Sequence, residues 1–261
     1  MKITSKTNRL IKEYNQLKKS RKERYKCGKF VVEGAKVCLE ALKSNFNVET
    51  IFITDNAKNK YSELIEEIEK TDADIYEISD EISEFLADTE TPQGVYIVCK
   101  MLDKIQYLDK INDNGTYIIL ENIQDPGNLG TIIRTADAMG IDCVYISSDS
   151  TDVYSSKVIR STAGSVFRQK FAIIENVPEF IKMLSEKGAT TFGAVLHRDS
   201  QILGTFEFPK LCGCVIGNEG NGLTDETIIA CNKLLTIPMS ENTESLNAGL
   251  AAGIIMWEMR K

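Results

Sequence analysis

Six short apolar segments in residues 116–261 alternate with helix-length amphipathic segments, and this alternation constrains the fold more than any other feature of the chain. Apolar runs of roughly four to eight residues are typical of buried strands. Strands that are separated by helices of crossover length predict a parallel sheet covered on both faces. The expected strands are residues 116–120, 143–146, 171–174, 191–196, 211–216 and 234–237, and the expected helices lie near residues 128–139, 155–163, 178–187, 224–231 and 246–260.

A shorter alternation precedes this unit and predicts a separate small α/β domain of about 70 residues. Strands are expected at residues 29–34, 48–54, 74–79 and 93–100, and helices at residues 35–44, 57–70 and 80–88. The predicted organisation is therefore a basic helical segment (1–28), a small α/β domain (29–100), a linker (101–115) and a larger α/β domain (116–261).

The charge of the chain is distributed unevenly. The net charge of −7 argues by itself against a nucleic-acid partner, yet residues 1–30 carry a net charge of +9 and the remaining residues −16. A basic helix suits a phosphate backbone, although a solvated amphipathic helix with Leu10, Ile11, Tyr14 and Leu17 buried would show the same pattern. Residues 61–90 contain twelve acidic residues and one lysine, so we do not expect that surface to meet RNA.

Cysteine usage and hydropathy predict a cytoplasmic protein with no membrane partner. No apolar run approaches the ~18 residues of a membrane span, and residues 1–6 lack the apolar stretch of a secretory signal. The seven cysteines fit neither a disulfide framework nor a zinc site, so we expect reduced, mostly buried thiols. Cys212 and Cys214 are expected on the same face of one strand.

Functional sites of parallel sheets lie beyond the carboxyl ends of the strands. The first of three unusual loops at such ends is residues 121–130, where a Pro-Gly pair predicts a tight turn and Asn128 stands at the expected helix N-cap. Arg134 lies off the apolar stripe of the following helix. It fits two roles, a functional side chain near the strand end or a surface ion pair with Asp137.

The second loop, residues 217–223, has three glycines and Glu219 as its one charged residue. It fits either a wide turn or a bare backbone that cradles a flat ligand, and Thr224 is expected to cap the next helix. The third loop runs from Ile237 to a helix that we expect Ser245 to cap. Small residues four apart in that helix predict a tight helix–helix contact, with a dimer interface as one possibility.

Together the three loops resemble the SpoU (TrmH) family of RNA 2'-O-ribose methyltransferases, within the SPOUT superfamily. The resemblance covers residues 122–140, 215–223 and 237–247, in that order. Residues 29–100, which include Phe30-Val31-Val32-Glu33-Gly34, look like the L30e-type substrate-binding domain of many members. The resemblance implies a trefoil-knotted SPOUT methyltransferase domain with a parallel sheet, preceded by a small α/β L30e-like domain.

The resemblance also implies S-adenosylmethionine as cofactor, an RNA partner, a homodimer and no metal. It places the catalytic residues at Arg134, Asn128, Glu219, Ser245 and Asn247. It places the cofactor-binding residues at Gly217, Asn218, Glu219, Gly220, Ile237, Met239, Ser245 and Leu246. Residues 157–164 match a segment for which RNA contacts are expected. The chain departs from the family at Ala248-Gly249 and in two acidic residues within 240–244.

Methyl transfer from a sulfonium requires alignment of the donor carbon with the ribose 2'-hydroxyl and the loss of one proton. We expect Arg134 to contact that hydroxyl and its phosphate, while Glu219 and Asn128 orient Arg134 or the substrate. Ser245 and Asn247 are expected to hold the loop. The family mechanism proposes the arginine as base, but a guanidinium pKa above ~12 favours stabilisation of a developing alkoxide. His197, the only histidine, lies outside the three loops.

The predicted function is S-adenosylmethionine-dependent methylation of a ribose 2'-hydroxyl, with 23S ribosomal RNA as the favoured substrate. The alternatives are a tRNA 2'-O-methyltransferase and a non-catalytic RNA-binding or ribosome-assembly protein. An enzyme that uses NAD or ATP is disfavoured, since the chain has neither G-x-G-x-x-G nor G-x-x-x-x-G-K-[ST].

Overall fold

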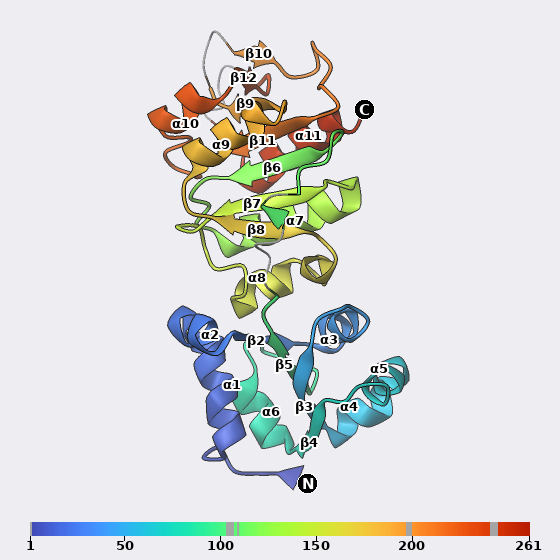
Figure 1. Ribbon diagram of the computed structural model, residues 1–261. Helices are drawn as coiled ribbons and strands as arrows, with labels where there is room; N and C mark the ends of the chain where they lie inside the picture. Colours follow the sequence, from blue (N-terminus) through green and yellow to red (C-terminus); the bar gives the residue numbers. More distant parts are fainter. Residues whose placement is uncertain (1, 103–106, 109, 197–199, 241–244) are drawn as a thin grey trace. The chain divides into compact units, whose positions relative to one another are not determined.

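The computed structural model describes residues 2–102, 107, 108, 110–196, 200–240 and 245–261. The chain forms two compact units, one from Met1–Leu102 and Asp152–Arg168 and one from Asp103–Thr151 and Gln169–Lys261 (Figure 1). Residues 152–168, which the sequence placed within the larger domain, therefore group by their contacts with the N-terminal unit.

The N-terminal unit contains a mixed five-stranded sheet in the order β1-β4-β3-β5-β2. Its first three strands in that order are parallel to one another, and β5 is antiparallel to both β3 and β2. The strands are β1 (Lys2–Ile3), β2 (Lys29–Glu33), β3 (Val48–Thr54), β4 (Asp74–Ile78) and β5 (Val95–Lys100). The four longer strands confirm the sequence prediction, whereas β1 is too short to leave a periodic signal.

The helices of this unit are α1 (Arg9–Lys19), α2 (Arg21–Cys27), α3 (Ala35–Leu42), α4 (Asp55–Lys60), α5 (Ser62–Ile68), α6 (Asp80–Leu86) and α8 (Ser156–Ser161). The single helix predicted over 57–70 is wrong, because the backbone of Tyr61 leaves the helical region and separates α4 from α5. Ile11, Tyr14 and Leu17 of α1 are fully buried in the core.

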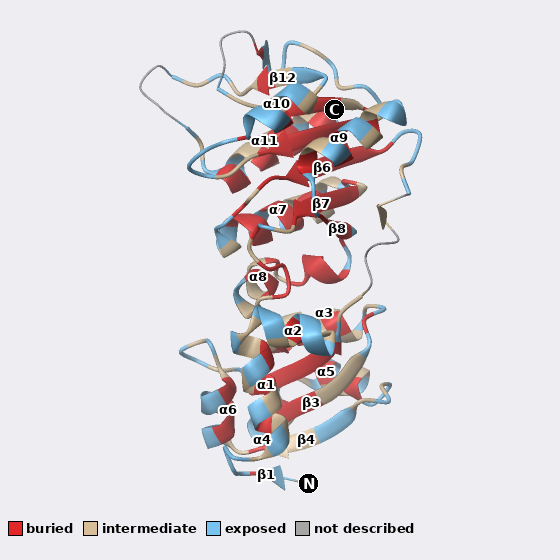
Figure 2. Ribbon diagram, turned by 60° about the vertical axis from the view of Figure 1, so that its left-hand side comes forward, coloured by how far each residue is buried: buried red, intermediate tan, exposed pale blue. Residues whose placement is uncertain are grey.

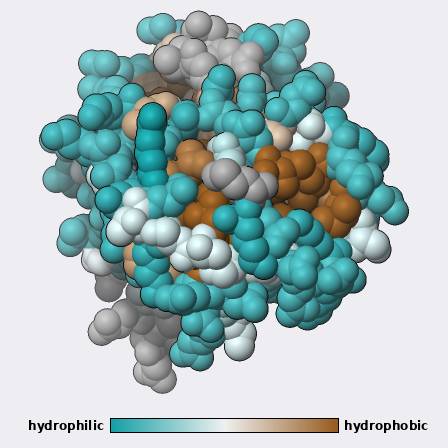
Figure 3. Space-filling model, turned by 90° about the horizontal axis from the view of Figure 1, so that it is seen from below, coloured by the Kyte–Doolittle hydropathy of each residue, from teal (hydrophilic) through white to brown (hydrophobic). Residues whose placement is uncertain are grey.

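Seen from below in Figure 3, the surface is mostly hydrophilic, with hydrophobic atoms gathered near its middle.

The C-terminal unit contains a seven-stranded sheet in the order β10-β12-β9-β11-β6-β7-β8. Every pair of neighbouring strands is parallel, which confirms the predicted sheet. The strands are β6 (Thr116–Leu120), β7 (Cys143–Ser147), β8 (Phe171–Ile174), β9 (Thr190–Ala194), β10 (Gln201–Ile202), β11 (Cys212–Ile216) and β12 (Lys233–Thr236). The central strands β6, β7 and β11 are buried along their whole length, as the red colour of β6 and β7 shows in Figure 2.

Two helix pairs cover this sheet, α7 with α11 and α9 with α10, and Figure 1 shows them on opposite faces. Their bounds are α7 (Pro126–Met139), α9 (Val177–Glu186), α10 (Asp225–Ala230) and α11 (Ala248–Met259). The expected tight helix contact forms within the chain, because a Cβ on Gly249 of α11 would meet Thr131 of α7 at 3.2 Å.

Two predicted helix caps are wrong and one is confirmed. Asp125 caps α7 and accepts a hydrogen bond from the Asn128 amide, so Asn128 lies in the first turn with its side chain left for other contacts. Asn247 caps α11 by accepting from the Leu250 amide, so Ser245 lies outside the helix. Thr224 caps α10 as predicted.

All seven cysteines are free, and five of them, including Cys212 and Cys214, are buried. In the register of β11 against β6, Cys212 and Cys214 pair with Thr116 and Ile118, which places both thiols on one face as predicted. Within the described residues, no helix combines the length and the apolar character needed to cross a membrane.

Candidate active site

The three predicted loops meet at the carboxyl edge of the parallel sheet. The first loop follows β6, the second follows β11, and these two strands are direct neighbours. The third follows β12, which pairs with β9 on the other side of β11. This edge is where open α/β sheets place their ligands.

Glu219 of the second loop is bound by the first loop at three points. Its carboxylate accepts hydrogen bonds from the backbone amides of Gln124 and Asp125, both at 3.1 Å, and from the Asn128 side chain at 2.9 Å. Burial alone would raise the pKa of Glu219, but these hydrogen bonds outweigh it and lower the pKa below its ordinary value. Glu219 is therefore an ionised anchor near neutral pH and a weak base.

Asn128 extends this contact to the third loop. Its Oδ1 accepts a hydrogen bond from Asn247 Nδ2 at 2.7 Å, while Asn247 Oδ1 caps α11. Glu219, Asn128 and Asn247 thus form one hydrogen-bonded chain across the three loops. Three of the five residues predicted to be catalytic are in direct contact.

The other two predicted catalytic residues lie apart from that chain. Arg134 is exposed on α7, six residues and about 9 Å of helix rise beyond Asn128. Among the described residues it makes no side-chain hydrogen bond or ion pair, so the contacts expected from Glu219 and Asn128, and the alternative pair with Asp137, are not formed. Ser245 is exposed at the edge of the neighbouring pocket.

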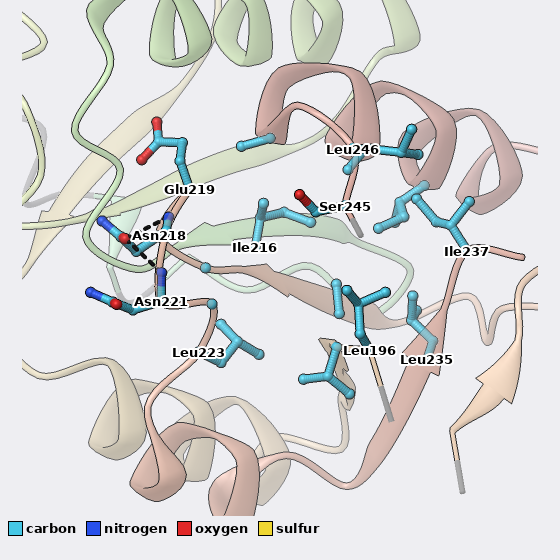
Figure 4. A pocket seen from close by; sticks show the side chains of 18 of the residues that line it. Leu196, Ile216, Asn218, Glu219, Asn221, Leu223, Leu235, Ile237, Ser245 and Leu246 are labelled. Carbon is cyan, nitrogen blue, oxygen red and sulfur yellow. Dashed lines mark hydrogen bonds between the residues drawn. The ribbon is translucent and has the colours of Figure 1, made fainter. Parts of the chain in front are cut away.

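A pocket of about 460 Å³ opens between the second and third loops (Figure 4). All eight residues predicted to bind the cofactor line it. Polar Asn218, Glu219 and Asn221 lie at one end, and aliphatic side chains that include Leu196, Leu235 and Ile237 lie at the other. Of the described residues that line the pocket, Glu219 is the one with a charge.

The second loop, residues 217–223, is called the glycine loop below. It is fixed by its own backbone and by the side chain of Asn218. Asn218 and Gly222 exchange backbone hydrogen bonds of 3.0 and 2.9 Å, and Asn218 Oδ1 accepts from the amides of Gly220 and Asn221. Asn218 Nδ2 donates to the carbonyl of Asn122 in the first loop. Gly217 has no space for a side chain, since a Cβ there would lie 2.3 Å from the carbonyl carbon of Gly222.

Sequence reasoning missed Glu121, which locks the far end of the same loop. Its carboxylate accepts from the amide of Thr224 at 2.9 Å, from the Thr224 hydroxyl at 3.0 Å and from the Thr227 hydroxyl. Glu121 is 7% exposed and Thr227 is fully buried. The sequence signal that could have indicated Glu121 is an acidic residue directly after an apolar strand. This signal does not identify the partners of Glu121, which lie about 100 residues away in the sequence.

We expect Glu121→Gln to weaken S-adenosylmethionine binding about fivefold to tenfold and to lower the unfolding free energy by about 1–2 kcal/mol, because a neutral amide is a weaker acceptor. Calorimetric titration and thermal unfolding measure the two effects. Asn232→Ala is the matched control, since it removes three hydrogen bonds at the opposite, amino end of the sheet. Equal losses of affinity in both variants would contradict a local role for Glu121.

His197 and the acidic residues within 241–244 lie outside the described residues. The predicted RNA-contact segment, residues 157–164, includes most of α8 in the N-terminal unit. The expected contacts there stay a prediction.

Two family models match the chain. Residues 115–257 match the SpoU rRNA methylase family, and residues 8–96 match the MRM3-like substrate-binding domain. The first match covers more than half of the chain and contains all three loops of the site.

Similar proteins match over nearly the full length. The 23S rRNA (guanosine(2553)-2'-O)-methyltransferase of Bacillus subtilis is 31% identical over 99% of this chain and 98% of its own length. The 23S rRNA (uridine(2479)-2'-O)-methyltransferase of Streptomyces viridochromogenes is 28% identical over 98% of this chain and 90% of its own length. The AdoMet-bound rRNA methyltransferase of Sinorhizobium meliloti, a crystal structure, has a TM-score of 0.87 and 28% identity, with coverage of 100% and 97%.

The fold, the three-loop site and these matches agree, and family membership implies the trefoil knot that no periodicity could reveal. The chain belongs to the SpoU rRNA methylase family and is an S-adenosylmethionine-dependent RNA ribose 2'-O-methyltransferase with an N-terminal MRM3-like, L30e-type substrate-binding domain.

Proposed function

We propose that this enzyme methylates a nucleotide of 23S ribosomal RNA in the cytoplasm. The support is that two curated relatives that span nearly the whole chain, from two bacteria, are named as 23S rRNA 2'-O-methyltransferases. The observation that carries the catalytic proposal is the hydrogen-bonded chain Glu219–Asn128–Asn247, which joins the three loops beside the pocket.

The pocket fits S-adenosylmethionine. Its aliphatic end suits a flat adenine, its volume lies within the usual range for ligand sites of roughly 300–1,000 Å³, and the carboxylate of Glu219 suits a cation. When bound, the cofactor supplies a methyl group on a positively charged sulfur. We propose that these lining residues hold it through backbone and aliphatic contacts: Gly217, Asn218, Gly220, Ile237, Met239, Ser245 and Leu246.

We propose that the chain's own residues contribute positioning and electrostatics. The bound cofactor would supply the methyl group that the 2'-oxygen takes up in exchange for its proton, which would leave to solvent. Glu219, Asn128 and Asn247 fix the loops so that donor and acceptor stay aligned, and Ser245 lies at the pocket edge. Arg134, with no described partner of its own, stabilises the negative charge that develops on the 2'-oxygen and holds the adjacent phosphate.

Methylation of defined RNAs tests this proposal. Purified protein and methyl-labelled S-adenosylmethionine are incubated in three separate reactions, one with 23S rRNA, one with 16S rRNA and one with tRNA. We expect label in 23S rRNA alone, at a linkage that resists alkaline hydrolysis, because a 2'-O-methyl group removes the attacking hydroxyl. Label in tRNA alone would overturn the substrate. Binding of the RNA without any transfer or cofactor binding would favour the non-catalytic alternative.

We also propose a homodimer, as the family resemblance implies. Leu250 and Trp257, seven residues apart on α11, are 54% and 56% exposed, so this helix carries an apolar face that a second copy would cover. Sedimentation of the protein should give the mass of a dimer, and Trp257→Glu should shift it to a monomer. A monomeric native protein would contradict this proposal.

A further inference from the structure

Four cations on the first two helices have no carboxylate partner among the described residues. Arg9, Lys12, Lys19 and Lys22 are exposed and make no ion pair with any described residue. Many other cations of the unit pair with carboxylates, whereas Lys36, Lys60 and Lys157 likewise make no ion pair with a described residue. Such pairs include Lys2 and Lys58 with Glu77, Lys6 with Glu81, Lys29 and Lys100 with Glu49, Lys43 with Glu63, Lys70 with Glu67 and Arg168 with Glu40.

The unpaired cations are arranged in a row. Arg9, Lys12, Gln16 and Lys19 follow one another at intervals of three, four and three residues, so they lie on one face of α1. The row is about 15 Å long at 1.5 Å per residue. A strand of duplex nucleic acid carries one negative charge per roughly 3.4 Å of axis, so several phosphates would lie within the length of this row.

An open groove of about 610 Å³ runs beside the row where α1 meets α2. It is lined by Asn15, Gln16, Lys19, Ser20, Glu23 and Lys26. Amide and hydroxyl groups of this kind bind phosphate and ribose oxygens. Glu23, the one acid among these lining residues, lies 3.9 Å from Lys26, which offsets its charge.

The two helices are held rigidly in place. Arg24 of α2 donates to Asp152 at 2.6 and 2.8 Å and to the carbonyls of Leu17 and Lys18 at the end of α1. Arg24 is 4% exposed, so this contact is a buried clamp between the helices. A surface that is already ordered loses less conformational entropy on binding.

The same geometry argues against a lipid partner. Helices that bind membranes insert an apolar face, but Ile11, Tyr14 and Leu17 of α1 are buried inside the unit. The outward faces of α1 and α2 are largely exposed (Figure 2), and most of their exposed residues are polar or charged in the sequence.

We infer that the row Arg9–Lys12–Gln16–Lys19, with the adjoining groove and Lys22, is a docking surface for the phosphate backbone of the substrate RNA. The inference rests on the proposed rRNA substrate. It assigns the electrostatic part of RNA binding to α1 and α2, which precede the L30e-like strands.

The test removes three positive charges from each of two places on the N-terminal unit. One variant carries Arg9→Gln, Lys12→Gln and Lys19→Gln, and the control carries Lys43→Gln, Lys58→Gln and Lys70→Gln, whose lysines are paired with glutamates. Both lose three positive charges, and glutamine preserves helix propensity. Binding to a 23S rRNA transcript is measured across a salt series, together with S-adenosylmethionine binding.

We expect the first variant to bind RNA at least about tenfold more weakly than the native protein. The slope of log affinity against log salt should become shallower by about 2, because each of the three lost phosphate contacts contributes roughly 0.7–0.9 to that slope. KM for RNA should rise, while kcat and S-adenosylmethionine binding stay unchanged. The control should bind RNA like the native protein.

Equal weakening in both variants, or an unchanged salt slope in the first, would overturn the docking surface. So would tighter binding of the native protein to phosphatidylserine vesicles than to RNA, with loss of vesicle binding in the first variant. Failure of the proposed function looks different, because the native protein itself would then transfer no methyl group to 23S rRNA.

Discussion

Replacement of Arg134 by alanine should lower the rate of methyl transfer by about 10²–10³-fold, equivalent to roughly 3–4 kcal/mol, while S-adenosylmethionine binding stays within about threefold of the native value. The two effects separate because Arg134 does not line the pocket and makes no described hydrogen bond that holds the loops. Single-turnover transfer to RNA measures the rate, and calorimetry measures the affinity.

Two further variants sharpen this prediction. Arg134→Lys keeps the charge but loses the planar, two-pronged donor, so we expect it to recover only part of the rate. Lys182→Ala removes an exposed cation from α9 in the same unit and should leave both quantities unchanged. Full activity of Arg134→Ala would remove Arg134 from the mechanism.

The second large effect is expected for Gly217→Ala. The new Cβ would lie 2.3 Å and 2.5 Å from the carbonyl carbon and oxygen of Gly222 and 2.6 Å from the amide nitrogen of Leu223. All three atoms belong to the backbone, so the loop itself must open. We expect S-adenosylmethionine affinity to fall by about 100-fold or more and the unfolding free energy by about 3 kcal/mol, the upper end for overpacking.

Gly188→Ala separates loss of stability from loss of the pocket. Gly188 has φ of +89° and open space around its Cβ position, and it lies at the end of α9 outside the pocket. Alanine there should cost about 1 kcal/mol through backbone strain alone and leave cofactor affinity unchanged. Native affinity in Gly217→Ala would show that the glycine loop does not shape the cofactor site.

The sequence predicted the longer strands of both units well because most of them are rich in apolar residues, as in residues 116–120 and 171–174, whose predicted bounds equal the observed ones. Two-residue strands such as β10 were missed because two residues cannot show a period. The break at Tyr61 was missed because the apolar spacing continues across it.

The residues of the site were predicted from motifs, but their contacts could not be. Asp125 and Asn128 are both good caps, and only the backbone decides that the aspartate takes this role. That exchange frees the Asn128 side chain to link Glu219 with Asn247, across 91 and 119 residues of sequence. The hydrogen bonds between Glu121 and Thr224 could not be predicted for the same reason, since no local sequence pattern indicates a partner 103 residues away.

The N-terminal unit is assembled from two separate stretches of chain, and this affects how it can form on the ribosome. Asp152, the partner of Arg24, is synthesised about 50 residues after the main stretch ends at Leu102. At about 5–20 residues per second, Asp152 follows Leu102 by roughly 2.5–10 s. During that interval the guanidinium of Arg24 lacks Asp152 as the counter-ion that accompanies it into the interior, so the unit cannot complete its native packing before residues 103–151 of the next unit have been translated.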